Sequence, residues 1–366
     1  MSSSVAHAGS TAPHCGDALA AAALSPAPRR VLMLGATGTI GRATARALVA
    51  RGHEVVCAVR PRAQAAAAGR ADSGQPTAAS DLQALQRSLP GATLREAQVG
   101  TPGALARNAI CGERFDALVS CMASRTGSPR DAWAVDHASH VQALQAAREA
   151  GVSQVVLLSA ICVQRPLLAF QHAKLAFERE LAACGLAYTI VRPTAFFKSL
   201  SGQVERVRRG QPFLVFGNGT LTACKPVSDR DLAAYLADCL DDPARRNRIL
   251  PVGGPGPALT PLDQARMLGE LLGRQVRVRH VPVRLLDAII GALELGGRLL
   301  PALAERAEFA RIGRYYATES MLVLDPATGR YDADATPSTG SDTLREHYAQ
   351  LLRGEVQDDR GAHAVF

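Results

Sequence analysis

One short turn limits what this chain can fold into more than any other stretch. Gly35, Gly38 and Gly41 form the pattern G-x-x-G-x-x-G, directly after the apolar run VLML and before a helical stretch. The first glycine allows a tight turn, the second lets the backbone approach a pyrophosphate, and the third lets the helix pack on the strand. Free N–H groups at the start of the helix then face the phosphate. The residues between the glycines that we expect at the cofactor are Thr37, Thr39 and Ile40.

Strand and helix patterns alternate through the first half of the chain. After a first strand that begins at Arg30, apolar strand runs are predicted at residues 54–60, 115–121, 154–159 and 187–191. Helical patterns are predicted between them, at residues 42–52, 80–89, 131–150 and 171–184. Such alternation requires parallel strands joined by right-handed crossovers. We therefore predict an α/β fold with a doubly wound parallel sheet of the Rossmann type.

The pattern changes after Pro193, where glycine and proline become frequent and the alternation weakens. Helices are predicted there at residues 229–240, 260–273 and 283–300. We expect a smaller C-terminal lobe that covers the substrate and also supplies late strands of the sheet. The resulting division is a disordered leader (1–28), a cofactor-binding Rossmann domain (29–195), a substrate-binding lobe (196–353) and a flexible tail (354–366).

The end of the second predicted strand indicates which dinucleotide binds. A carboxylate there would bond the ribose 2′-hydroxyl of NAD, but this strand ends in Arg60 with Arg62 just beyond. A guanidinium suits a 2′-phosphate, so we predict NADPH as the cofactor. The 41 basic and 33 acidic residues give a net charge of +8, which favours anionic ligands. Basic tracts typical of nucleic-acid binding are missing, and the histidines and cysteines lack metal-site spacing, so neither partner is predicted.

The helix at 171–184 departs from the pattern of a short-chain dehydrogenase. Such an enzyme has Tyr-x-x-x-Lys there, and this chain has Lys174 but carries Phe170 in the position of the tyrosine. Ser159 occupies the usual catalytic position at the end of the preceding strand. We predict catalytic roles for Lys174, which would also bind the nicotinamide ribose, and for Ser159. Reduction of C=O needs an acid beside the oxygen. Without the phenol, we favour reduction of a conjugated C=C bond or a non-catalytic NADP sensor.

Several longer segments resemble one family, the flavin-free, NADPH-dependent divinyl chlorophyllide 8-vinyl reductases. That family belongs to the atypical short-chain dehydrogenases, alongside isoflavone reductases and NmrA-like proteins. The matching segments are VLMLGATGTIG (31–41), VSCMASRTG with DAWAVD (119–136), LLSAICVQRPLLAFQHAKLAFE (157–178), VRPTAFFKSLSGQVE (191–205), FGNGTLTACKPVSDRDLA (216–233), PVGGPGPALTP (251–261) and IGRYYATESMLVLDPATG (312–329). The glycine motif is widespread, whereas SAICVQ, RPTAFFKSL and GRYYA look specific to this family.

The resemblance implies a tetrapyrrole substrate, 3,8-divinyl chlorophyllide or protochlorophyllide, whose 8-vinyl group is reduced to ethyl. Hydride would reach the outer vinyl carbon, and a proton the inner one, from solvent or a donor such as His172 or Cys162. Two other functions stay open. An NmrA-like NADP sensor would explain Phe170 but not the specific downstream segments, and an isoflavone-type reductase would act on another aromatic substrate.

Candidate contacts cluster after the strand at 187–191, at the sheet edge where ligands bind. Pro193 would border the nicotinamide. The side chains expected at the substrate, by stacking on the macrocycle or pairing with a propionate, are Phe170, Phe196, Phe197, Lys198, Lys225 and Tyr315.

The amphipathic helix at 283–300 leaves two interpretations open, burial in the lobe or contact with a membrane surface or greasy ligand. The resemblance implies a cytoplasmic enzyme in a bacterium, with membrane association left open, or a plastid enzyme in a plant or alga. The sequence does not predict an oligomeric state.

Overall fold

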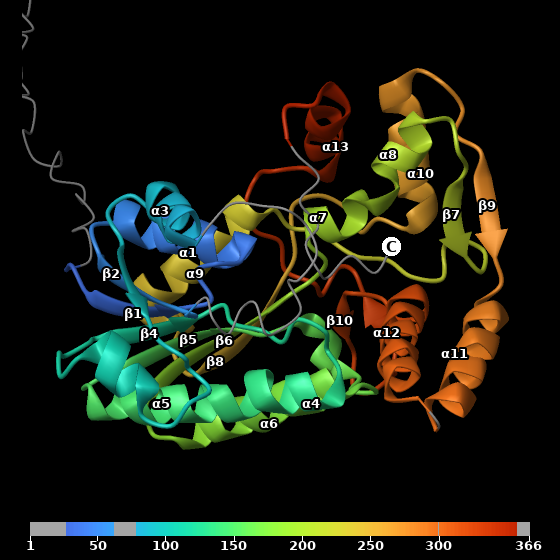
Figure 1. Cartoon of the computed structure of the whole chain (residues 1–366). Helices are drawn as coiled ribbons and strands as arrows, with labels where there is room; N and C mark the ends of the chain where they lie inside the picture. Colours follow the sequence, from blue (N-terminus) through green and yellow to red (C-terminus); the bar gives the residue numbers. More distant parts are fainter. Residues whose placement is uncertain (1–26, 62–77, 299, 357–366) are drawn as a thin grey trace, which may run out of the picture.

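The computed structural model describes residues 27–61, 78–298 and 300–356. Within these ranges, seven parallel strands form one sheet in the order β3-β2-β1-β4-β5-β6-β8 (Figure 1). Their bounds are β1 Arg30–Leu34, β2 Glu54–Val59, β3 Thr93–Glu96, β4 Ala117–Ser120, β5 Gln154–Leu158, β6 Ala187–Pro193 and β8 Arg248–Val252. The strand order reverses beside β1, which is the switch point where such sheets bind ligands.

Helices cover both faces of the sheet because successive strand residues point to opposite sides. In β1, Val31 and Met33 enter one core, and Leu32 and Leu34 enter the other. The first core is closed by α1 (Thr39–Ala50), α3 (Ala78–Ser88) and α9 (Asp229–Asp241). The second is closed by the π-helical segment η1 (Ala106–Ile110), α5 (His140–Glu149) and α6 (Ala169–Ala183).

The C-terminal lobe lies beyond the carboxyl ends of the strands (Figure 1). Its upper part contains α7 (Phe197–Leu200), η4 (Ser201–Gln203), α8 (Val204–Arg208), β7 (Phe213–Phe216), α10 (Pro261–Leu272), β9 (Val278–Val281) and α13 (Leu344–Arg353). Its lower part contains α11 (Val283–Gly297), α12 (Pro301–Thr318), β10 (Val323–Leu324) and β11 (Tyr331–Asp332). Short turns η3 (Ile161–Gln164) and η5 (Pro243–Arg245) follow β5 and α9.

The predicted doubly wound sheet is confirmed, with two local differences. Strand β3 has no apolar run, since its sequence is TLRE at the sheet edge, and it was not predicted. The helix predicted at 131–150 begins as α4 (Pro129–Ala132), widens into the π-helical segment η2 (Trp133–Ser139) and continues as α5. The leader up to residue 26, Arg62 and the tail from residue 357 lie outside the described residues.

Three segments cross between sheet and lobe, residues 194–197, 224–228 and 252–254, and a fourth, residues 336–339, connects β11 to α13 within the lobe and lies beside them. We call these four segments the crossing seam. Backbone bonds join them, from Val227 N to Ala195 O (2.9 Å) and from Gly253 N to Pro337 O (2.7 Å). A Cβ on Gly254 would lie 1.8 Å from the carbonyl oxygen of Pro226. A Cβ on Gly253 would lie 2.7 Å from Cβ of Lys225, so the close approach explains the first two glycines of PVGGPG. Residues 229–252, which follow the second crossing, return to the sheet as α9 and β8.

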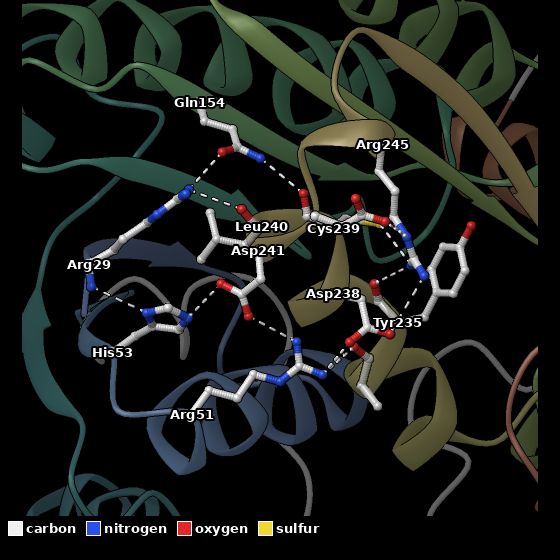
Figure 2. A network of polar contacts seen from close by, with 12 residues as sticks. Arg29, Arg51, His53, Gln154, Tyr235, Asp238, Cys239, Leu240, Asp241 and Arg245 are labelled. Carbon is white, nitrogen blue, oxygen red and sulfur yellow. Dashed lines mark hydrogen bonds and ion pairs between the residues drawn. The ribbon is translucent and has the colours of Figure 1, made fainter. Parts of the chain in front are cut away.

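A polar network lies at the opposite edge, where the strands begin (Figure 2). Asp241 of α9 accepts hydrogen bonds from Arg51 at the end of α1 (3.1 Å) and contacts the buried His53 (3.1 Å). Arg29 bonds Gln154 at the start of β5 (2.8 Å). The network therefore ties α1, α9 and the sheet together away from the carboxyl ends of the strands.

Candidate active site

A large pocket of about 460 Å³ opens at the carboxyl ends of the parallel strands. That volume lies within the range of small-molecule sites. Its walls come from the loops after β1, β4, β5 and β6 and from the lobe. The lining includes Gly38, Thr39, Ile40, Ser124, Arg125, Gly127, Ser159, Cys162, Phe170, Lys174, Pro193, Phe196, Lys198, Phe309, Ile312 and Tyr316.

The glycine turn fits a dinucleotide. Gly35 has φ +81°, and a Cβ there would lie 2.6 Å from the backbone of Cys121 after β4. A Cβ on Gly41 would lie 2.1 Å from the carbonyl oxygen of Gly35, so the helix can approach the turn only without a side chain. Gly38 caps α1 without a side-chain bond to the helix, and the first turn carries no acidic residue. The free N–H groups and the helix dipole are thus available to a phosphate.

Two positively charged side chains, Lys198 and Arg125, line the same pocket as this turn. Lys198 Nζ donates to Thr39 Oγ1 over 3.1 Å, which brings the lysine to the start of α1. Its ammonium group therefore lies beside the glycine turn, while its predicted pairing with a substrate carboxylate stays a prediction. Arg125, which was not predicted, lines the pocket from the loop after β4. Asp131 shapes that loop by accepting from the backbone N–H groups of Arg125 and Thr126, both over 2.8 Å.

Lys174 reaches the pocket from α6 and forms a buried ion pair. Its Nζ lies 3.0 Å from Oδ1 of Asp136, whose side chain is fully buried. The same oxygen accepts from the backbone N–H of Ser124 over 3.2 Å, while Oδ2 has no hydrogen-bond partner among the described residues. Asp136 belongs to the π-helical segment η2, which packs beside α6. The sequence offered no spacing rule that would pair Asp136 with Lys174.

Ser159 lines the pocket directly after β5, as predicted, but its proton points away from a ligand. The hydroxyl donates to Oε1 of Glu178 on α6 over 2.5 Å, and Glu178 is also paired with Arg192. A hydroxyl has one proton, so Ser159 can offer only a lone pair to a bound molecule. Its catalytic role stays a prediction, restricted to accepting a hydrogen bond.

Phe170 forms an apolar wall of the pocket together with the lobe. It belongs to a buried cluster with Cys162 and Ile312. A Cβ on Gly127 would lie 2.8 Å from Ile312 and 3.7 Å from Phe170, so these two side chains flank the same glycine. Cys162 also lines the pocket, and burial raises the pKa of its thiol. His172, the other predicted proton donor, is exposed and lies outside the pocket lining.

Three residues predicted to contact substrate lie outside the lining. Phe197 packs in the lobe core, with its ring 5.4 Å from that of His347. Lys225 donates to the carbonyl oxygen of Thr336 over 3.0 Å, within the crossing seam. The Tyr315 hydroxyl donates to the carbonyl oxygens of Cys162 and Arg165, at 2.9 and 3.1 Å. Because internal contacts occupy these groups, we correct the prediction and assign them to the frame of the pocket.

The remaining predicted positions divide between lining and exterior. Ile40, Pro193 and Phe196 line the pocket, at the positions expected for cofactor and substrate. Thr37 and Arg60 are exposed and do not line it. Among the described residues, no group of three or more histidine, cysteine, aspartate or glutamate side chains is arranged to hold a metal ion.

Sequence comparison relates the chain to an NAD(P)H-binding family and to two plant reductases. A family model described as NAD(P)H-binding matches residues 35–243. A rice protein named divinyl chlorophyllide a 8-vinyl-reductase, chloroplastic, is 48% identical over 94% of this chain and 84% of its own length. An Arabidopsis thaliana protein of the same name is 43% identical over 90% and 78%, respectively.

Solved structures share the fold at lower identity. A leucoanthocyanidin reductase from Vitis vinifera, solved with NADPH, has a TM-score of 0.60 and 17% identity, and covers 88% of this chain and 99% of its own. The match at this identity extends only to the fold. The family model and the relatives together place this chain in the NAD(P)H-binding family and, within it, among the divinyl chlorophyllide a 8-vinyl-reductases.

Proposed function

We propose that this protein reduces the 8-vinyl group of a 3,8-divinyl chlorophyllide or protochlorophyllide to an ethyl group, with NADPH as reductant. The observation that carries the proposal is the pocket itself. It keeps Lys174 beside a dinucleotide turn but presents Phe170 where a carbonyl reductase needs a phenol. An apolar wall suits a hydrocarbon group better than an oxygen that gains charge. The names of the relatives, at 43% to 48% identity, support the same substrate.

The residues that would hold the cofactor come from two sides of the pocket. The backbone of the turn and the N-terminus of α1 bind the pyrophosphate, and Lys198 adds a positive charge there. Lys174 bonds the nicotinamide ribose, and Pro193 borders the nicotinamide. When bound, NADPH supplies a hydride. Asp136 holds the ammonium group of Lys174 in place at 3.0 Å and balances its charge inside the protein.

The substrate would lie between the strand ends and the lobe. Phe170 and Phe196 line this part of the pocket and offer apolar faces to a flat macrocycle. Arg125 has no side-chain hydrogen bond or ion pair among the described residues and lines the same pocket, so its guanidinium can pair with the propionate carboxylate. This geometry leaves Ser159 as a hydrogen-bond acceptor at the edge of the site.

The preference for NADPH over NADH rests on Arg60, which directly follows β2 and is exposed. Its guanidinium has no hydrogen bond or ion pair with another described residue, so it is available to a 2′-phosphate. We expect kcat/KM to be at least tenfold higher with NADPH than with NADH, and Arg60→Ala to remove most of that difference. Equal use of the two cofactors by the unaltered protein would contradict this assignment.

One assay tests the proposed reaction. Purified protein is incubated with NADPH and 3,8-divinyl chlorophyllide, and the product is followed by absorbance and chromatography. We expect the 8-ethyl product, formed in step with NADPH consumption. No product under aerobic or anaerobic conditions would refute the proposal and favour an NADP sensor, whereas turnover of an isoflavone would favour the other reductase class.

We also propose peripheral contact with an anionic membrane surface through α11 and α12. Only Ile290 of the apolar helix α11 is buried, while Leu285, Ile289 and Leu295 are 51%, 42% and 66% exposed. The acidic residues of α11 are paired with arginines of α12, through Asp287–Arg314 and Glu294–Arg311.

The charges of α11 and α12 that have no ion partner among the described residues sum to a positive value. They are those of Arg284, Arg298 and Arg306 and of one carboxylate, Glu305, and all four residues are exposed. An apolar face bordered by unpaired arginines is the pattern of a helix that lies in the headgroup region. No helix in the described part of the chain is long and apolar enough to cross a bilayer. The rice and Arabidopsis relatives are chloroplastic, and we propose a plastid location if the source is a plant or alga, and a cytoplasmic one in a bacterium.

A further inference from the structure

The proposed reaction needs a second hydrogen, delivered as a proton. The ammonium group that α6 presents to the pocket, that of Lys174, is held by Asp136 at 3.0 Å and is assigned above to the ribose. Phe170 has no acidic proton, and the hydroxyl proton of Ser159 is committed to Glu178. His172 is exposed and lies outside the pocket lining. A general acid must reach the reacting carbon directly or through one water, so the donor has to come from the pocket wall.

Helix α12 presents one face to this pocket. Phe309, Ile312 and Tyr316 all line it, with the three- and four-residue spacing that places side chains on the same side of a helix. Ile312 and Phe170 flank Gly127, so this face of α12 meets α6 where the phenol is missing. Tyr316 follows Ile312 by one turn and packs against the cluster that contains Phe170 and Cys162.

The hydroxyl of Tyr316 is nearly without internal partners. Its one contact among the described residues is a weak one, 4.0 Å to the sulfur of Cys162. The neighbouring Tyr315 differs, because its hydroxyl donates to two backbone carbonyls. The Tyr316 side chain is partly buried, and a phenol withdrawn from water in this way normally finds a strong acceptor. Tyr316 therefore has a proton available to a molecule that occupies the pocket.

We propose that Tyr316 is the general acid that protonates the inner carbon of the vinyl group, so that a phenol from the lobe replaces the one absent from α6. This proposal rests on the function proposed above. As the new C–H bond forms at the outer carbon from hydride, the electron pair of the C=C bond moves to the inner carbon and the macrocycle. That pair takes the proton of Tyr316, the O–H bond breaks, and water returns a proton to the phenolate. The sum is one hydride and one proton for each vinyl group reduced.

The protonation state agrees with this role. Burial raises the pKa of Tyr316 well above its ordinary value, so the hydroxyl keeps its proton at neutral pH. Burial likewise raises the pKa of Cys162, which is the competing donor on the same wall. The test must therefore separate the phenol from the thiol.

The variant Tyr316→Phe removes only the hydroxyl. We expect kcat to fall by about 10²-fold, the scale of general acid catalysis. We expect the Kd of divinyl chlorophyllide, measured by absorbance titration without cofactor, to stay within twofold of the unaltered protein. A matching loss of substrate affinity would make Tyr316 a binding residue and would overturn the proposal.

Stereochemistry gives a readout that a structural role would not change. In D2O, an enzyme-bound acid places deuterium on one face of the inner carbon, and NMR resolves the two methylene positions of the chiral product. We expect one isomer from the unaltered protein, from Cys162→Ala and from Tyr315→Phe, and a mixture from Tyr316→Phe because water then protonates both faces. Retention of the single isomer by Tyr316→Phe would overturn the assignment, and so would a mixture from Cys162→Ala alone. Absence of any 8-ethyl product from the unaltered protein would instead refute the reaction itself.

Discussion

At the scale of single residues, the buried pair of Lys174 and Asp136 is the most consequential contact of the site. Both charges are withdrawn from water, and each is costly without the other. The pair fixes the position of the ammonium group without using its remaining hydrogens. Lys174 can therefore donate to a ribose hydroxyl while Asp136 balances its charge.

The first prediction concerns Lys174. Replacement by alanine removes the ribose contact and leaves Asp136 as an uncompensated buried charge. We expect kcat to fall at least about 10²-fold, and the free energy of unfolding by roughly 3–5 kcal/mol. Steady-state kinetics and urea unfolding measure the two effects. The double variant Lys174→Met, Asp136→Asn should regain most of the stability and none of the activity, and turnover near the normal rate in either variant would show that Lys174 is not central.

The second prediction concerns Phe170. Restoring the phenol with Phe170→Tyr should give no gain in kcat, because the vinyl group has no oxygen to protonate. Chromatographic product assays with the unaltered protein alongside measure this. A several-fold increase in the rate of 8-vinyl reduction would mean that the site lacks an acid and would count against both the mechanism and the role of Tyr316.

The third prediction concerns His140, a buried residue between the sheet and Lys174. Burial, and then the charge of Lys174, lower its pKa from 6.5 to about 4. Ser120 and the carbonyl of Val135 bond the two nitrogens of the neutral ring, at 2.8 and 2.9 Å. The unfolded chain therefore binds a proton at this residue at a higher pH than the folded chain does. The contribution of neutral His140 to the free energy of unfolding is complete above pH 6.5 and is lost as the pH falls towards 4.

The expected loss at His140 is about 3 kcal/mol in the free energy of unfolding over that window. Asp136 and His137 also face this region, so the measurement compares urea unfolding of the unaltered protein and His140→Asn at each pH. The difference between the two should shrink on acidification from pH 6.5 to 4. A difference that stays constant over this range would show that His140 is not the group responsible.

At the scale of elements, α11 stands out because it is apolar yet mostly exposed. The fourth prediction replaces Leu285, Ile289 and Leu295 with serine together. We expect sedimentation with vesicles that contain anionic lipid to fall at least fivefold, while the fold persists because these side chains bury little area. Leu82→Ser on α3, which is 39% exposed and remote from α11, is the matched control and should sediment normally. Equal sedimentation of all three proteins would contradict the membrane surface.

Elements also show how far sequence could predict the site. Gly35, Gly41 and Lys174 can be proposed from the sequence because the roles predicted for them depend on spacing within one turn or one helix. Asp136, Arg125 and Tyr316 cannot, because the contacts that single them out join elements distant in the chain. The periodicity of a sequence does not show which distant residues are in contact. Phe197 was predicted to contact the substrate because it closely follows a strand end. It is instead the first residue of α7, and its side chain packs in the lobe core.

At the scale of the whole molecule, stability and catalysis use opposite edges of the sheet. The network around Asp241 lies where the strands begin, and the pocket lies where they end. Residues at one edge can therefore change without disturbing the other. The fold class is predictable because the alternation of strands and helices is a regional pattern. A late strand of the sheet was also expected from the second half of the chain, but the place of β8 beside β6 depends on long-range packing.

The fifth prediction tests this separation. Asp241→Ala leaves the buried His53 without a carboxylate and leaves Arg51 with Asp238 alone. We expect a loss of about 1–3 kcal/mol in the free energy of unfolding. kcat should stay within twofold of normal below the unfolding transition. Glu205→Ala, which removes the partner of Arg208 and Arg209 on an exposed helix, should change stability by less than about 1 kcal/mol. A fall in kcat of the folded Asp241→Ala protein would link the two edges.

The crossing seam affects how this protein behaves after a protease cuts its chain. Because the chain passes three times between sheet and lobe, and the four seam segments are bonded to one another, we expect a single cut in a surface loop of the lobe to free neither part. The two fragments should stay together through β8, α9 and the seam, and migrate as one particle until denatured. Conversely, a fragment that ends at residue 195 would lack α9 and β8 and would expose one core of the sheet. We therefore expect the two parts to fold as one unit, with neither part soluble and folded when it is produced alone.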